Sequence, residues 1–216
     1  MARGRWFRER IEPQLYGARH GLLREHLARY RFASSFARGR VLDAGCGTGY
    51  GAQILAAVDT VTEVIGVDCD ERAIAHARRY YGGGGITFRR LDLLCGAARA
   101  EPRFDTIVAF EVLEHLIDPE GLMETCDLLL APGGRLLVST PLGQGRDVPS
   151  DQPGHFFQLR RSEFVRLLGS RFQARLFGQK GELIEPWRRG GRYFLMLALC
   201  RSRDSAAAGT AERRKG

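Results

Sequence analysis

The chain has 216 residues, 44% of them hydrophobic, and a formal net charge of +8. This size and composition suit one domain with a sizeable core. The chain has no apolar run of transmembrane length, and its first ten residues, MARGRWFRER, lack the apolar core of a signal peptide, so we expect a cytoplasmic protein. Its five cysteines are scattered, and we expect them to be reduced thiols.

The basic charge lies at the two ends of the chain. Residues 1–40 carry a net charge of +7 and residues 201–216 a net charge of +3, whereas residues 41–200 carry −2. A solvated basic surface is the simpler interpretation, and an RNA-binding track is the alternative. Because residues 201–216 have no apolar periodicity, we expect them to form a disordered basic tail.

The first predicted elements are one or two amphipathic helices within residues 8–37, where leucines and Tyr30 recur at helical spacing. We expect residues 1–38 to form a helical cap in front of the first strand. His26, Arg29 and Tyr30 are placed to contact a ligand, and the alternative is that Tyr30 belongs to the buried side of a covering helix.

Residues 41–51, VLDAGCGTGYG, predict a buried strand that enters a glycine-rich turn and then a helix. Alternating glycines let the backbone bend sharply and approach a ligand closely. A dinucleotide-binding turn requires a further glycine where Tyr50 stands, and Asp43 would repel a pyrophosphate but attract an ammonium or sulfonium group. The segment resembles motif I of class I S-adenosylmethionine (SAM)-dependent methyltransferases, whose pattern is hhDhGCGxG.

Two further predicted strands also end in an acid. Residues 61–67 run into Asp68, which is placed to accept hydrogen bonds from both hydroxyls of a ribose, and Asp70 is the expected N-cap of a helix that extends to Tyr81. Residues 86–91 run into Asp92 and Leu93. The resemblance implies that Asp92 meets the adenine edge and that Cys69 lies against the adenine face.

Residues 104–110 predict a central strand buried on both faces, followed by a helix over 116–130, a turn at 131–134 and a strand over 135–139. The pattern FDxIVxFEVLEHLxDP…LLxPGGxLLxSTP resembles methyltransferases related to the ubiquinone-biosynthesis O-methyltransferases. Together with the three acids, the resemblance covers about residues 40–141.

The rest of the chain predicts a polar loop over 142–154, long enough to be a substrate lid, a helix over 162–168, and strands over 172–177 and 193–200. The order of elements predicts an α/β, Rossmann-like sheet of seven strands, six parallel and the last antiparallel, with helices on both faces. We expect one domain over residues 1–200, with a cofactor-binding core at 39–141 and a substrate loop and C-terminal strands at 142–200.

The resemblance implies that SAM is the cofactor. The residues expected to bind it are Tyr30, Asp43, Gly45, Cys46, Gly47, Gly49, Asp68, Cys69, Asp92, Leu93, Phe110 and Glu111.

Methyl transfer from a sulfonium is an in-line displacement, and an alcohol acceptor must also lose its proton. The candidate catalytic residues are His155, His115 and Glu111, because histidine can act as a base near neutral pH. Glu111, Glu114, His115 and His155 also resemble a metal-binding set, in which the first three share one side of a helical turn. We expect a metal-independent reaction in which His155 is the more sensitive histidine.

The sequence thus predicts a SAM-dependent methyltransferase that acts on an oxygen of a small molecule or glycan precursor. A metal-dependent RNA 2′-O-methyltransferase, which shares the ExxEH motif, is disfavoured because Leu159 replaces a tryptophan and Gln152-Pro153-Gly154 stands where that group has a further histidine. Outside the enzymes, the alternative is a non-catalytic SAM-binding or regulatory protein.

Overall fold

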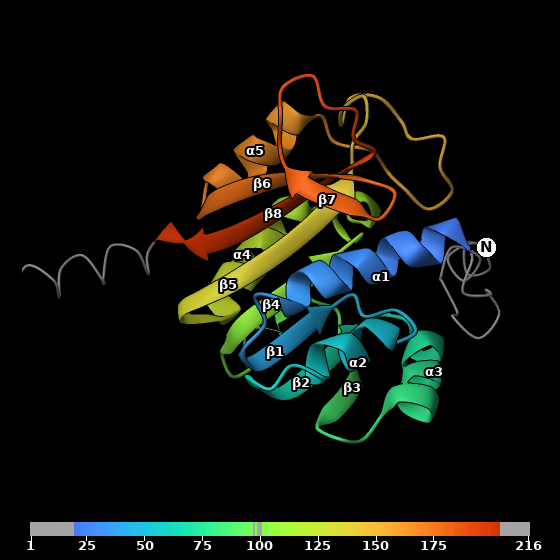
Figure 1. Ribbon diagram of the computed structural model, residues 1–216, viewed down its shortest axis with the longest axis vertical. Helices are drawn as coiled ribbons and strands as arrows, with labels where there is room; N and C mark the ends of the chain where they lie inside the picture. The colour runs from blue at the N-terminus through green and yellow to red at the C-terminus, as the bar shows by residue number, and fades with distance from the viewer. Residues whose placement is uncertain (1–19, 97, 99–100, 204–216) are drawn as a thin grey trace, which may run out of the picture.

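The structure of the chain is a computed structural model that describes residues 20–96, 98 and 101–203 (Figure 1). Its helices are α1 (Gly21–Ser34), α2 (Tyr50–Ala56), α3 (Glu71–Tyr81), the one-turn 3₁₀ helix η3 (Leu113–His115), α4 (Pro119–Leu129) and α5 (Arg161–Gly169). Its strands are β1 (Gly39–Ala44), β2 (Val61–Asp68), β3 (Ile86–Arg90), β4 (Phe104–Phe110), β5 (Leu130–Pro141), β6 (Phe172–Lys180), β7 (Leu183–Pro186) and β8 (Leu195–Ser202). The predicted helical segment before residue 20 and the predicted disordered tail from residue 204 lie outside the described residues.

The strands of the described residues form one sheet in the order β3-β2-β1-β4-β5-β8-β6-β7. Neighbours from β3 to β5 pair in parallel, whereas β8 pairs antiparallel with both β5 and β6. Strand β6 therefore runs in the same direction as β1 to β5, which confirms the predicted six parallel strands and the antiparallel last strand. Strand β7 pairs antiparallel with β6 and adds an eighth strand that the sequence pattern does not predict.

Several predicted boundaries are wrong by a few residues. Helix α4 begins at Pro119, because the Asp118 carboxylate caps it by accepting a hydrogen bond from the Gly121 N–H at 2.9 Å. The turn expected at 131–134 falls within β5 as a break in register, since Phe104 pairs with Leu130 but Thr106 pairs with Arg135. Strand β8 extends to residue 202, two residues into the segment assigned to the tail.

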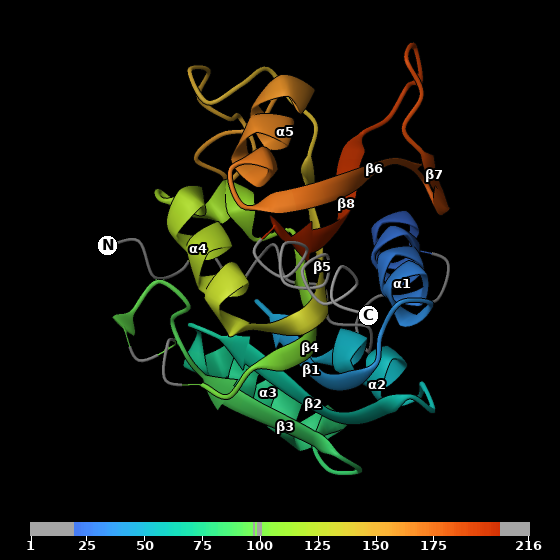
Figure 2. The same cartoon turned by 90° about the vertical axis from the view of Figure 1, so that its left-hand side faces the viewer.

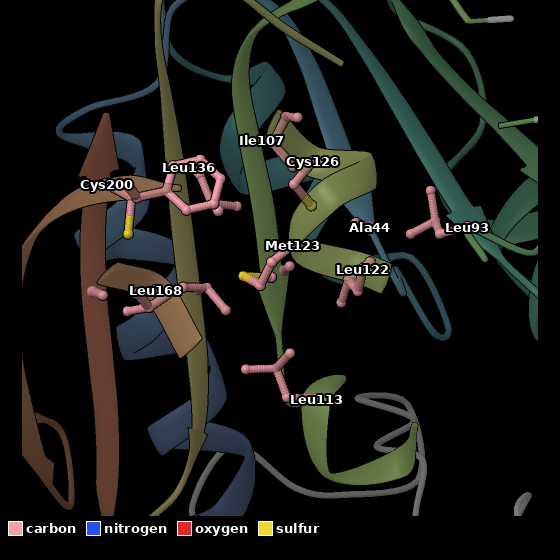
Figure 3. Packing of buried hydrophobic residues seen from close by; sticks show 14 of the residues in the cluster. Ala44, Leu93, Ile107, Leu113, Leu122, Met123, Cys126, Leu136, Leu168 and Cys200 are labelled. Atoms are coloured by element: carbon pink, nitrogen blue, oxygen red, sulfur yellow. The ribbon is translucent and has the colours of Figure 1, made fainter. Parts of the chain in front are cut away.

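Helices cover both faces of the sheet, as predicted (Figure 2). One apolar cluster joins α1, α2 and α3 to one face, and the second joins α4 and α5 to the other. In Figure 3, Met123 and Cys126 of α4 point toward Ile107 of β4 and Leu136 of β5. Because the central strands are buried on both faces, they read as near-continuous apolar runs in the sequence.

The connections between elements place the chemically interesting residues at one edge of the sheet. The parallel strands β1 to β4 all end at this carboxyl edge, and helix α1 begins near it because α1 leads into the opposite end of β1. Ligands of open parallel α/β sheets bind outside the carboxyl ends of the strands. All five cysteines are free thiols. Within the described ranges, no helix is both long enough and apolar enough to span a bilayer.

Candidate active site

The glycine-rich turn after β1 forms the floor of a cavity of about 240 Å³ at the carboxyl edge. The Gly45 and Cys46 N–H groups both donate to the Val67 carbonyl of β2, at 2.8 and 2.9 Å, which holds the turn against the neighbouring strand. Gly47 has a φ of +54°, and an added Cβ there would meet nothing within 4 Å, so glycine is required here by the backbone conformation rather than by crowding. The turn presents bare main chain to the cavity.

Most of the predicted cofactor and catalytic residues line this cavity. They are Tyr30, Gly45, Cys46, Gly47, Asp68, Cys69, Asp92, Leu93, Phe110, Glu111 and His115. The predicted residues Asp43, Gly49, Glu114 and His155 are not among its lining residues. Residues outside the predicted cofactor and catalytic sets also line it: His26, Thr48, Tyr50, Val67, Leu91, Leu94, Val112, Leu116 and Leu122.

The lining divides into an apolar part and a polar part. Leucine side chains from the end of β3 and from the η3–α4 region make up much of the apolar part, where Leu91, Leu93 and Leu116 lie. The polar part contains Glu111 and His115. A cavity lined by both apolar and polar side chains fits a ligand that combines an aromatic base with a charged chain, which is the chemistry of SAM.

Asp68 connects the end of β2 to the glycine turn. Its Oδ2 accepts from the Gly47 N–H at 3.0 Å and its Oδ1 accepts from the Asp70 N–H at 2.9 Å, and the side chain is buried at the cavity wall. Asp70 caps α3 through the Arg72 N–H, as predicted. Asp92 at the end of β3 accepts from the Leu94 N–H at 2.9 Å and also lines the cavity.

Asp43 lies behind the cavity wall and is fully buried. The Tyr30 hydroxyl donates to Asp43 Oδ1 at 3.0 Å, while Oδ2 has no hydrogen-bond partner among the described residues. Burial raises the pKa of Asp43 to about 7, an effect that the Tyr30 hydrogen bond opposes and the Asp68 charge reinforces. A carboxylate with one unpartnered oxygen beside the glycine turn fits a cationic ligand group nearby.

Helix α1 covers the cavity and is held there by buried polar contacts. His26 Nδ1 lies 2.9 Å from the Tyr50 hydroxyl of α2. Arg29, which is buried, donates from Nη1 to Gln179 Oε1 of β6 at 2.9 Å. The predicted contact of this helix with a ligand thus has a physical basis in His26 and Tyr30, both of which line the cavity.

Glu111 follows β4 in an unusual backbone conformation. Its φ of +55° is the one positive value at a non-glycine residue within the described part of the chain. The Ser139 hydroxyl donates to Glu111 Oε1 at 3.1 Å, and this holds the carboxylate at the end of β5. The expectation that Glu111, Glu114 and His115 share one side of a helical turn is wrong, because the helix at this point is a single 3₁₀ turn that begins only at Leu113.

Glu114, His115 and His155 form a compact group beside the cavity. One ligand-type atom from each lies within 4.8 Å of the others, and the two imidazole rings meet edge to face at 4.7 Å. His115 Nδ1 lies 3.0 Å from the Gly154 carbonyl, which can only accept, so Nδ1 carries the proton. Burial, with His115 beside it, lowers the pKa of His155 to about 4.

Glu114 is the buried acid of this group. The Thr140 hydroxyl donates to its Oε2 at 3.0 Å, and its Oε1 has no partner among the described residues. Burial and the nearby Glu111 carboxylate raise the pKa of Glu114 well above its ordinary value. The donor set of one carboxylate and two imidazoles suits a divalent transition metal, and Glu111 is not a member of the group.

Some lining residues had local signals in the sequence. Tyr50 interrupts the glycine pattern, Val112 lies within the ExxEH segment and Leu116 directly follows it, so both features mark the turn that follows a strand. Leu91 and Leu94 surround Asp92 in the same way. His155 meets His115 only because the loop after β5 folds back, with the Phe156 N–H donating to the Glu114 carbonyl at 2.8 Å, and no local pattern predicts that contact.

A comparison with protein families agrees with this geometry. The profile of a methyltransferase-domain family matches residues 16–181. The chain therefore belongs to that family, within the class of SAM-dependent methyltransferases, and SAM is its cofactor.

Individual relatives carry related names. An S-adenosylmethionine-dependent methyltransferase of Mycolicibacterium smegmatis is 37% identical over 168 residues, which is 74% of this chain and 62% of that protein. A ubiquinone biosynthesis O-methyltransferase of Methylocella silvestris is 36% identical over 121 residues, which is 54% of this chain and 45% of that protein. This chain thus spans less than two thirds of the length of these relatives.

A solved structure shares the fold. The crystal structure of a TehB-like SAM-dependent methyltransferase of Corynebacterium glutamicum superposes with a TM-score of 0.64 at 21% identity, covering 82% of this chain and 88% of that one.

Proposed function

We propose that this chain transfers the methyl group of SAM to an oxygen of a small molecule or glycan precursor. The observation that supports the proposal most directly is the polar part of the cavity, where Glu111 and His115 stand beside the expected methionine end of the cofactor. A relative named for O-methylation in ubiquinone biosynthesis supports an oxygen acceptor.

The reaction is a displacement in which the acceptor oxygen forms a bond to the methyl carbon as the carbon–sulfur bond breaks. The sulfonium sulfur keeps the electron pair and becomes a neutral thioether, and the acceptor proton passes to a base on the protein. Of the two candidate bases His115 and His155, His115 lines the cavity, and its Nδ1–H bond to the Gly154 carbonyl leaves Nε2 as the basic nitrogen. This changes the expectation that His155 is the more sensitive histidine: because His115 and not His155 lines the cavity, we assign the base to His115 and a positioning role to His155, whose ring packs edge to face against that of His115.

Metal assistance is the alternative at this site, because Glu114, His115 and His155 are suitable ligands. A divalent cation held by these side chains would lower the pKa of an acceptor hydroxyl and orient it. The unpartnered oxygen of Glu114 and the unpartnered Nδ1 of His155 favour this alternative. The metal-independent route stays the primary prediction.

The test begins with a screen of labelled SAM against sugars, quinols and RNA, which identifies the acceptor. With that acceptor, turnover in EDTA should equal turnover in buffer, and His115→Asn should lower kcat more than His155→Asn does. Loss of turnover in EDTA that Mg²⁺ or Mn²⁺ restores, with unchanged affinity for S-adenosylhomocysteine (SAH), would establish the metal route instead. If SAH binds but no acceptor is methylated, the protein is a cofactor-binding protein without this activity.

A further inference from the structure

Exposed apolar side chains occur in several of the segments that meet at the carboxyl edge of the sheet, the edge at which the cavity lies. Among the described residues, Ile117 is 81% exposed, Phe194 71% and Leu183 60%, values that set them apart from ordinary surface residues. Leu22 and Phe156 are each about half exposed. Scattered single apolar residues are normal on a protein surface, but several at one edge of a fold mark a candidate interaction site.

These five residues come from separate segments that meet at the carboxyl edge. Ile117 and Phe156 lie on one side, where the Phe156 N–H donates to the Glu114 carbonyl at 2.8 Å. Leu22 and Leu183 lie on the other side, where α1 is tied to the β6–β7 hairpin by the ion pair between Arg24 and Glu182. We call these residues, together with Phe194, the apolar rim.

Phe194 stands between the two sides. The Phe194 N–H donates to the Gln179 carbonyl at 3.0 Å, and the Leu142 N–H donates to the Phe194 carbonyl at 3.0 Å. Phe194 is thus fixed between the end of β6 and the start of the long loop after β5. In both Figure 1 and Figure 2, the loop between β7 and β8 and the loop between β5 and α5 project toward the top of the molecule.

The loop that carries Phe194 is strongly basic. Residues 187–194 read WRRGGRYF and contain three arginines and no acid. Arg188, Arg189 and Arg192 are all exposed. Arg188 forms a loose ion pair with Glu185 at 3.9 Å. Aromatic and aliphatic side chains among exposed arginines are typical of segments that lie in the interface of an anionic membrane.

We propose that the apolar rim and the 187–194 loop dock this domain on an anionic phospholipid surface, with the cavity mouth facing the lipid. The aliphatic members Ile117 and Leu183 favour lipid over nucleic acid as the partner. Their side chains cannot form ion pairs or hydrogen bonds with a phosphate backbone, but their burial among acyl chains lowers the free energy of binding. The arginines match the charge of the lipid head groups. This part of the proposal rests on the proposed methyl transfer: with the cavity mouth facing the lipid, an acceptor in the lipid surface can reach Glu111 and His115.

The experiment measures co-sedimentation of the full chain with phosphatidylcholine vesicles, with and without phosphatidylglycerol. We expect binding to the phosphatidylglycerol vesicles only. The rim variant Ile117→Ser/Phe194→Ser should lose about tenfold in vesicle affinity for each apolar side chain removed. The charge variant Arg189→Gln/Arg192→Gln should show a loss that grows as the salt concentration falls.

The matched control is Leu128→Ser/Val165→Ser, which removes two exposed apolar side chains from α4 and α5, away from the mouth. It should bind vesicles as the unmodified chain does, and all variants should bind SAH equally, which shows that they are folded. Absence of vesicle binding by the unmodified chain, or an equal loss in the control, would overturn the proposal. So would binding to a single-stranded RNA oligonucleotide that depends on the arginines alone. None of these outcomes depends on whether methyl transfer is detected.

Discussion

The Asp68 carboxylate holds the glycine turn in place, because it accepts hydrogen bonds from the Gly47 and Asp70 N–H groups. We expect it also to accept from the ribose hydroxyls of SAM. Asp68→Ala should therefore weaken SAH binding by about 2–3 kcal/mol, since it removes charge-assisted hydrogen bonds and leaves buried donors unpaired. Isothermal titration calorimetry measures this directly.

The control for this prediction is Asp70→Ala, two residues away. Asp70 accepts from the Arg72 N–H at 2.8 Å as the N-cap of α3, so its loss should lower stability by about 1 kcal/mol and leave SAH affinity unchanged. Unaltered SAH affinity in Asp68→Ala would show that the second strand meets the cofactor in another register.

The raised pKa of Asp43 predicts how the stability of the fold depends on pH. Its pKa in the folded, cofactor-free chain is raised to about 7, mainly by burial, whereas an unfolded chain has the ordinary value near 4. Between these values the folded state holds a proton that the unfolded state has released. The free energy of unfolding contributed by this group must therefore fall as pH rises from about 4 to about 7.

The measurement is urea unfolding of the cofactor-free protein across this pH range, compared with Asp43→Asn. The amide has nearly the same shape and stays neutral, so the variant should lack this part of the decline and gain stability relative to the unmodified chain as pH rises. The difference is at most roughly 3–4 kcal/mol. Parallel curves for the two proteins would show that Asp43 does not titrate in this window.

At the scale of elements, the seating of helix α1 on helix α2 depends on one glycine. A Cβ added at Gly51 would lie 2.1–2.5 Å from the ring of Tyr30, the residue that donates to Asp43. Gly51→Ala should displace the ring and cost about 1–3 kcal/mol in stability through overpacking. Because Tyr30 also lines the cavity, SAH affinity should fall in parallel.

A double-mutant cycle tests this contact. Adding Tyr30→Leu to Gly51→Ala should cost less than the sum of the two single changes, because the clash is already relieved. Gly169→Ala serves as the comparison, since an added Cβ there meets nothing within 4 Å and should leave both properties nearly unchanged. Additive effects at positions 30 and 51 would mean that α1 moves aside without strain.

The elements that the sequence predicts well are those whose own residues carry the signal. The strand over Phe104–Phe110 is a near-continuous apolar run, and Asp70 marks the start of its helix as the N-cap, so both predictions are confirmed. Strand β7 has only four residues, ends in Pro186 and takes its hydrogen bonds from β6, so its own sequence carries almost no strand signal.

The candidate site divides in the same way. Gly47 and Asp68 meet because adjacent parallel strands end together, and strand order is predictable from the repeated pattern of strand, turn and acid. The pairing of His115 with His155 depends on how a long loop folds back, and the position of Glu111 depends on a backbone with positive φ. Tertiary packing fixes both features, so local periodicity misplaced Glu111 on a helical turn.

At the scale of the whole molecule, the net positive charge lies toward the two ends of the chain, and the N-terminal part of it includes helix α1. Residues 41–200 carry a net charge of −2, and the excess of basic over acidic residues lies in residues 1–40 and 201–216. Strand β8 extends to Ser202, where it pairs with Phe172, so the removable tail begins at Asp204 rather than at Arg201. The tail beyond that point has three basic residues against two acidic ones.

Deleting residues 204–216 should leave the melting temperature and SAH affinity almost unchanged, because the deletion removes no strand pairing of the described sheet. Deleting residues 201–216 should lower the melting temperature, since it also removes the pairing of Arg201 and Ser202 with β6. Differential scanning calorimetry and SAH titration compare the two truncations. If the shorter deletion weakened binding to an RNA oligonucleotide and made the salt dependence of the remaining binding shallower, the tail would contact phosphates, and an RNA acceptor would replace the small molecule.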